Sequence, residues 1–122
     1  MPLDSSFNQL KQPSPYAIAL LNALTSEQDF KRYPRGSRFV FVQGGEHQCL
    51  FFRTGVVSIE NIENSLLLGI ASAPVSLGFT SALSDKLLIR ALEECEAATI
   101  PLDDVMETIE RKHLWEIMAK HM

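Results

Sequence analysis

The sequence predicts a mainly β domain with helices at both ends. β-branched and aromatic residues form short runs that are typical of strands, for example at residues 38–42 and 49–53. Glycines separate these runs, and the pair Gly44 and Gly45 is the strongest turn signal. Helical apolar spacing precedes and follows the strand region. This order of elements predicts a β-barrel or jelly roll with helices packed outside it.

The size and composition fit a single globular domain. The chain has 122 residues, of which 46% are hydrophobic and 21% are charged. The net charge of −4 argues against a large nucleic-acid-binding surface, because phosphate contacts need clustered Lys and Arg. No apolar segment is long enough to span a membrane, and residues 1–12 lack a signal-peptide pattern. We therefore expect a cytoplasmic protein with no membrane contact and with reduced cysteines.

Residues 1–15 are expected to form a flexible arm, and residues 16–122 are expected to form the domain. The arm contains three of the six prolines. Helices are predicted over residues 16–33, because apolar residues recur there at helical spacing. These apolar residues are Ile18, Leu20, Leu21, Leu24 and Phe30.

The barrel is predicted over residues 36–101, and C-terminal helices are predicted over residues 102–122. Asp103 and Asp104 suit the first turn of a helix, where the dipole is positive. Val105, Met106 and Ile109 would form its apolar face. The predicted strand segments are residues 37–43, 49–53, 56–60, 65–71, 87–92 and 96–100.

The order of the glycines and strands resembles the sensor domains of Crp/Fnr-type regulators. The residues that carry this resemblance are Gly36, Gly44, Gly45, Gly55 before the run 56–59, Gly78, and the run 95–100. The resemblance covers about residues 30–122. It implies a double-stranded β-helix (jelly-roll) barrel of the cyclic-nucleotide-binding type. In this family the barrel is followed by a short helix and a dimer helix.

A narrower similarity is to the IprA (inhibitor of hydrogen peroxide resistance) group of winged-helix regulators. Residues 68–74 followed by Gly78 carry it, as do Ile109 and Glu110 before Leu114 and Trp115. The similarity implies a sensor domain of a transcription regulator linked to oxidative-stress control. DNA would be bound only through a winged-helix domain, which this sequence lacks. Whether the chain is truncated or a stand-alone module stays open.

The family's phosphate-binding residues are replaced in this sequence. Nucleotide-binding members have a Gly–Glu pair at a helix start and a following Arg, which together hold the cyclic phosphate and ribose. Here Phe79 follows Gly78, and Asp85 or Lys86 stands near the arginine position. A carboxylate repels phosphate, and Lys86 lacks the bidentate geometry of arginine. We predict no tight cyclic-nucleotide binding and no cofactor.

A degenerate pocket for an unknown small ligand is the remaining binding-site candidate. It would comprise Gly78, Phe79, Thr80, Lys86 and Arg90. The alternative for Phe79 is a core side chain, and the alternative for Arg90 is an outward-facing sheet residue. We favour both alternatives.

Cys49 and Cys95 are the candidates for a redox role. His47 shares a strand face with Cys49, whereas Glu94 and Glu96 beside Cys95 disfavour a thiolate. We expect both cysteines to be small buried side chains, with an oxidant sensor as the alternative.

No motif indicates catalysis or a metal site. There is no Cys-x-x-Cys motif, and the three histidines are dispersed in the sequence. No nucleophile elbow, P-loop or dinucleotide fingerprint occurs, so we expect no enzyme. The alternatives are a ligand-free dimerisation or protein-interaction module and, with less support, a small cupin-type enzyme. The apolar residues near the C-terminus are Leu114, Trp115, Ile117 and Met118, and Trp115 would pack on the barrel or face a partner. We expect a monomer or weak homodimer.

Overall fold

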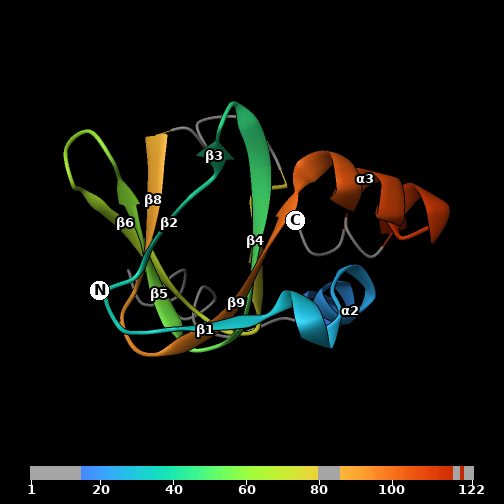
Figure 1. The fold of residues 1–122 in the computed structure, drawn as a ribbon, viewed down its shortest axis with the longest axis horizontal. Helices are drawn as coiled ribbons and strands as arrows, with labels where there is room; N and C mark the ends of the chain where they lie inside the picture. Colours follow the sequence, from blue (N-terminus) through green and yellow to red (C-terminus); the bar gives the residue numbers. More distant parts are fainter. Residues whose placement is uncertain (1–14, 80–85, 117–118, 120–122) are drawn as a thin grey trace, which may run out of the picture.

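The computed structural model describes residues 15–79, 86–116 and 119. These residues form two antiparallel sheets that face each other, with helices on the outer side of one sheet (Figure 1). The mainly β architecture with flanking helices is the one that the sequence predicts. The part of the chain that the structure describes contains no helix of sufficient length and apolarity to cross a membrane.

The first sheet is built around its two longest strands, β4 (Glu46–Thr54) and β9 (Cys95–Pro101), which pair antiparallel. β1 (Lys31–Tyr33) pairs with the other edge of β9. β3 (Val42–Gln43) and β7 (Val75–Leu77) both pair with β4. This sheet carries the helices.

The second sheet has the order β2-β8-β5-β6. Its strands are β2 (Arg38–Val40), β8 (Leu87–Ala91), β5 (Val56–Asn61) and β6 (Leu67–Ser72). β5 and β6 form a hairpin, and their register shifts between Ile59 and Glu60. The second sheet therefore ends at β6 on one side and at β2 on the other.

The helices are α2 (Pro15–Leu24), the short 3-10 helix η1 (Glu27–Asp29) and α3 (Leu102–Arg111). α3 begins directly after the last residue of β9, so this strand passes into the helix without a loop. Val105 and Ile109 are buried, and Met106 packs against the same cluster, which confirms the predicted apolar face. Leu114 packs there too, whereas Trp115 is 53% exposed.

The central strand β4 is buried on both faces. Cys49 and Phe51 contribute to the core between the first sheet and the helices. Leu50 and Phe52 contribute to the core between the two sheets. Side chains alternate between the faces of a strand, so one run of five buried residues serves two cores.

The core between the sheets is apolar. Its buried members come from six strands and from Phe41, which lies between β2 and β3. They are Phe39, Phe41, Leu50, Phe52, Val57, Ala71, Ile89, Ala91, Cys95 and Ala97. Side chains of this kind fill the interior of a small barrel.

The tight turn between β4 and β5 requires glycine. Gly55 has a φ of +101°, a conformation that side chains with a Cβ rarely adopt. A Cβ at this position would lie 2.6 Å from the Cβ of Cys95 and 3.0 Å from the carbonyl oxygen of Glu94. The turn therefore places β5 close to the start of β9.

The predicted helical region 16–33 is wrong at its C-terminal end. Residues Lys31–Tyr33 form strand β1, paired with Cys95, Glu96 and Ala97 of β9. Pro34 disfavours helical backbone at the residue before it, and the pairing with β9 fixes the extended conformation. Ile18, placed in the predicted apolar stripe, is 46% exposed, whereas Leu20, Leu21 and Leu24 are buried.

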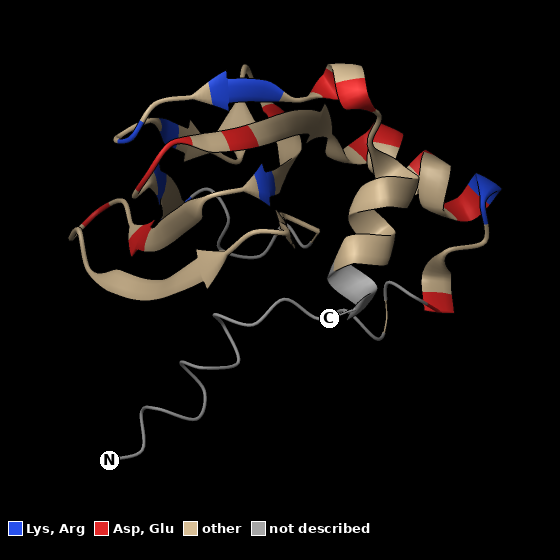
Figure 2. Cartoon of the chain, turned by 90° about the horizontal axis from the view of Figure 1, so that it is seen from below, with Lys and Arg blue, Asp and Glu red and all other residues tan. Residues whose placement is uncertain are grey.

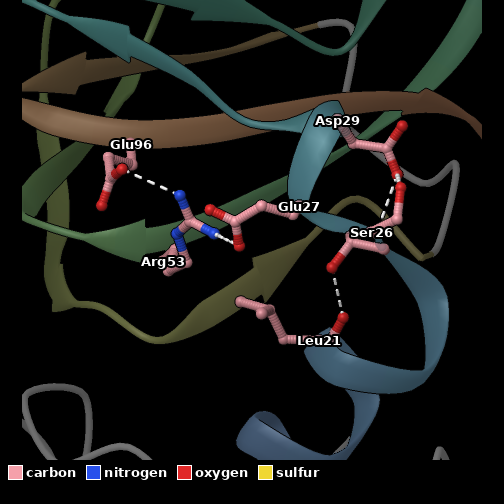
Figure 3. A network of polar contacts seen from close by, with 7 residues as sticks. Leu21, Ser26, Glu27, Asp29, Arg53 and Glu96 are labelled. Carbon is pink, nitrogen blue, oxygen red and sulfur yellow. Dashed lines mark hydrogen bonds and ion pairs between the residues drawn. The ribbon is translucent and has the colours of Figure 1, made fainter.

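A two-carboxylate contact joins η1 to the first sheet (Figure 3). The guanidinium of Arg53 donates to Glu27 of η1 over 2.6 Å and to Glu96 of β9 over 2.8 Å. It also lies over the ring of Phe30, 4.4 Å from the ring centre. Ser26 and Asp29 close the turn at the start of η1 by hydrogen bonds between them. Arg53 thus attaches the helical segment to β4 and β9.

The hydrogen bond from Arg53 lowers the pKa of Glu96, although partial burial opposes the shift. A carboxylate whose pKa is lower in the folded than in the unfolded protein stabilises the fold above the unfolded pKa. This stabilisation is lost as the pH falls through the folded pKa. The contact should therefore stabilise the domain at neutral pH and cease to do so in acid.

We predict that Arg53→Met lowers stability more at neutral pH than below the ordinary glutamate pKa of about 4.3. Urea unfolding at both pH values measures the difference. Arg111→Met is the matched control, since Arg111 lies 3.8 Å from Glu107 with both side chains exposed, and such pairs contribute little. An Arg53→Met effect of the same size at both pH values would contradict this account.

Candidate functional site

Gly78 lies at the end of β7 and is packed tightly against β4. Its φ is +98°, and a Cβ there would lie 2.9 Å from the carbonyl oxygen of Gln48 and 2.9 Å from Cδ1 of Phe41. The carbonyl oxygen of Gly78 accepts a hydrogen bond from Nε2 of His47 over 3.0 Å and from the thiol of Cys49 over 3.5 Å. Since a carbonyl only accepts, Nε2 of His47 carries a proton. His47 and Cys49 share a strand face, as the sequence predicts.

Phe79 is a core side chain. It is 9% exposed and belongs to the cluster between the first sheet and the helices, which includes Leu20 and Ile109. Its ring meets Phe51 edge to face, with 6.0 Å between ring centres. Phe79 thus packs on the helix side of the first sheet and not between the two sheets. This is the core position that the sequence analysis favours.

Arg90 lies on the outer face of the second sheet. Its neighbours in β8, Ile89 and Ala91, are buried between the sheets, so the alternating Arg90 faces outward. Its Nε donates to Glu60 over 3.1 Å, and its Nη2 donates to the second carboxylate oxygen over 3.4 Å. Ser58 also donates to Glu60, and the bond from Arg90 is the main cause that lowers the pKa of this carboxyl. In the described part of the chain, the carboxylate that pairs with Arg90 is therefore that of Glu60, a side chain of the protein itself.

The structure places two of the predicted pocket residues, Phe79 and Arg90, on different sheets. Phe79 faces the helices beside the first sheet, whereas Arg90 faces outward from the second sheet. Lys86 is exposed, and its carbonyl accepts from the backbone N–H of Ile62 over 2.7 Å. Thr80 and Asp85 lie outside the described residues. A ligand site around residues 78–86 stays a prediction.

Both cysteines are free and fully buried. Burial raises the pKa of the Cys49 thiol to about 12. Burial also raises the pKa of Cys95, and the charge of Glu94 adds to this shift. The thiolate is the reactive form, so both environments oppose redox chemistry at neutral pH. Across residues 15–79, 86–116 and 119, no three His, Cys, Asp or Glu side chains gather as metal ligands would.

Solved structures with a similar fold include CprK, the global regulator CLP and a catabolite activator protein. Oxidised CprK in complex with o-chlorophenolacetic acid superimposes with a TM-score of 0.62 and 14% identity, over 89% of this chain and 46% of CprK. The c-di-GMP-responsive regulator CLP of Xanthomonas campestris gives 0.61 and 19% identity, over 88% and 57% of the two chains. The Thermus thermophilus catabolite activator protein gives 0.59 and 18% identity, over 88% and 52%.

The chain has the Crp/Fnr sensor-domain fold. It spans about half the length of these three regulators, because it covers 46%, 57% and 52% of them. No family model matches the sequence, and no curated protein matches it. The narrower grouping with IprA therefore gains no support from the comparisons.

Arg53 is a residue of structural importance that the sequence analysis did not single out. It is the only charged residue in the otherwise uncharged run 48–53 of β4. A cation directly after the fully buried Phe51 and Phe52 needs a carboxylate partner. This position in the sequence could have indicated a structural ion pair. The partners Glu27 and Glu96 lie 26 and 43 residues away, so only the fold reveals them.

We predict that neither Cys49 nor Cys95 reacts with a thiol reagent in the native state at neutral pH, whereas both react in denaturant. Burial of both thiols and their raised pKa values are the reason. Mass spectrometry after labelling counts the modified thiols, and Ile18→Cys supplies an exposed positive control on α2. Labelling or mild-peroxide sulfenylation of either native cysteine would revive the oxidant-sensor hypothesis.

Proposed function

We propose that this chain is the regulatory sensor domain of a Crp/Fnr-type bacterial transcription regulator and that it does not bind a cyclic nucleotide. The fold shared with CprK, CLP and the catabolite activator supports the assignment as a sensor domain. The position of Phe79 supports the absence of cyclic-nucleotide binding. A buried aromatic ring stands where the family's nucleotide-binding members need a glutamate.

The charge distribution supports the loss of the nucleotide site. Arg90 forms an ion pair with Glu60. Lys86 is a point charge without the bidentate geometry of arginine. The described side chains that are buried include no arginine or lysine. A cyclic phosphate in such an interior would lack a cation to compensate its charge.

The fold offers a direct route by which a signal could reach an attached domain. β4 contributes side chains to both cores, and β9 continues directly into α3. A change in the packing of the barrel would therefore be passed to the position of α3. We propose that α3 leads toward a DNA-binding winged helix in a longer cytoplasmic regulator. The link to oxidative stress rests on the resemblance to IprA alone.

The signal is proposed to be an uncharged or weakly charged small ligand, or a protein partner. The structures with this fold include one bound to an aromatic acid and one that responds to a cyclic dinucleotide, so the fold itself does not fix the ligand. The second candidate function is a ligand-free protein-interaction module. The apolar side chains that fill the space between the sheets favour it.

We predict that cAMP, cGMP and c-di-GMP give no binding heat with this chain at ligand concentrations up to about 1 mM, the limit for weak ligands. Isothermal titration calorimetry measures this, with a nucleotide-binding regulator of the same fold as the positive control. Micromolar binding of any of the three would overturn the proposal that the site is lost.

The same ligands can be tested by thermal unfolding. A ligand present at 100 times its Kd stabilises the native state by about 2.7 kcal/mol. No shift is expected with the cyclic nucleotides. A shift with o-chlorophenolacetic acid would favour the sensor over the ligand-free module, because only the sensor has room for a ligand.

A further inference from the structure

Strand β6 (Leu67–Ser72) is an open edge of the second sheet. In the part of the chain that the structure describes, it pairs with β5 alone and ends the order β2-β8-β5-β6. An edge strand presents one row of backbone N–H and C=O groups that can pair with another strand. The chemistry of this edge therefore defines what it can bind.

The backbone groups that point outward can be assigned from the hairpin. The N–H of Ala73 donates to the carbonyl of Gly55, and the N–H of Asn61 donates to the carbonyl of Leu66. Hydrogen-bonding residues alternate along an antiparallel strand, so Ala71 and Gly69 face β5. The N–H and C=O groups of Ile70 and Ser72 consequently point away from the sheet.

β6 lacks two of the features that usually protect an edge, namely charged side chains and short length, although its pairing with β5 shifts register between Ile59 and Glu60. β1 and β2 also lie at the edges of their sheets and have three residues each. β1 carries Lys31 and Arg32, and β2 carries Arg38. β6 has six residues and no charge (Figure 2). Lysine, arginine and short length are common means to prevent edge pairing, whereas a long uncharged edge invites it.

Exposed leucines lie at the start of this edge. Leu66, Leu67 and Leu68 are 58%, 54% and 49% exposed. Ile62, in the hairpin turn, is 48% exposed. Large apolar side chains that gather at one place on a surface mark an interaction site more often than scattered ones do. The apolar surface and the open backbone edge are thus adjacent.

We propose that β6 pairs antiparallel with β6 of a second copy of this chain, about a two-fold axis at Ile70. Ile70 then lies opposite Ile70 of the partner, and Leu68 lies opposite its Ser72. The two second sheets become one continuous sheet with four strands from each copy. This interface does not depend on the proposed sensor function.

A second copy suits this edge because the strand is compatible with itself. Pairing two identical strands about a two-fold axis brings each side chain near its own equivalent, and like charges there would repel. No residue from 65 to 74 is charged. The leucine end of one strand lies beside the Ala73–Pro74 end of the other, so apolar side chains meet. The pairing uses both β6 edges, so the assembly closes as a dimer.

Sedimentation velocity over a range of concentrations tests the interface. We expect the wild-type chain to dimerise, and we expect Ile70→Lys to raise the dissociation constant at least about tenfold, because two cations would meet at the axis. The matched control is Ile18→Lys, which makes the same change at an exposed position on α2 and should leave the dimer intact. Circular dichroism establishes that each variant is folded.

A cross-link gives an independent readout if Ile70→Lys fails to fold. Opposite residues of a hydrogen-bonded antiparallel pair have Cα atoms about 5.5 Å apart, within the range of a disulfide. Ile70→Cys should therefore form covalent dimers on oxidation, since Cys49 and Cys95 are buried and unavailable. A wild-type chain that stays monomeric would overturn the proposal. The proposal would also be overturned if Trp115→Lys dissociated the dimer while Ile70→Lys remained dimeric and Ile70→Cys formed no cross-link.

Discussion

The burial of β4 on both faces is the constraint on which the rest of the structure depends. Cys49 and Phe51 hold α2 and α3 against the first sheet, and Leu50 and Phe52 fill the space between the sheets. Removal of a large buried side chain costs about 3–5 kcal/mol, which is a large part of the stability of a domain of this size. Because these four residues are consecutive, the two cores cannot be separated without distorting β4.

Part of this organisation could be predicted from the sequence. The central parts of the long strands follow from runs of β-branched and aromatic residues, and the apolar face of α3 follows from helical spacing. β1 and β7 could not be predicted, because three residues carry too little pattern and their pairing partners in β9 and β4 are distant in the chain. The sequence also suggested that Phe79 is a core residue. It could not show that this core lies outside the barrel, since that depends on how β7 pairs with β4.

The same packing supports the proposal that this domain does not bind a cyclic nucleotide. The family site needs an acceptor and a cation near the end of β7, and this chain offers Phe79 packed on Phe51 and Arg90 bound to Glu60. Both residues contribute to stability instead. Arg53 has a similar role at the other end of β4, where it attaches η1 to the sheet. The polar groups that remain near the barrel serve the structure, so a signal would act through packing more than through a fixed charge.

Native-state amide hydrogen exchange tests the central claim that β4 makes the two cores one cooperative unit. The account predicts that amides of β4, of β8 and of the buried face of α3 exchange with the same opening free energy, equal to that of global unfolding. Exchange of the α3 amides through a much lower opening free energy than that of β8 would contradict it, because the helix core would then open while the barrel stayed folded.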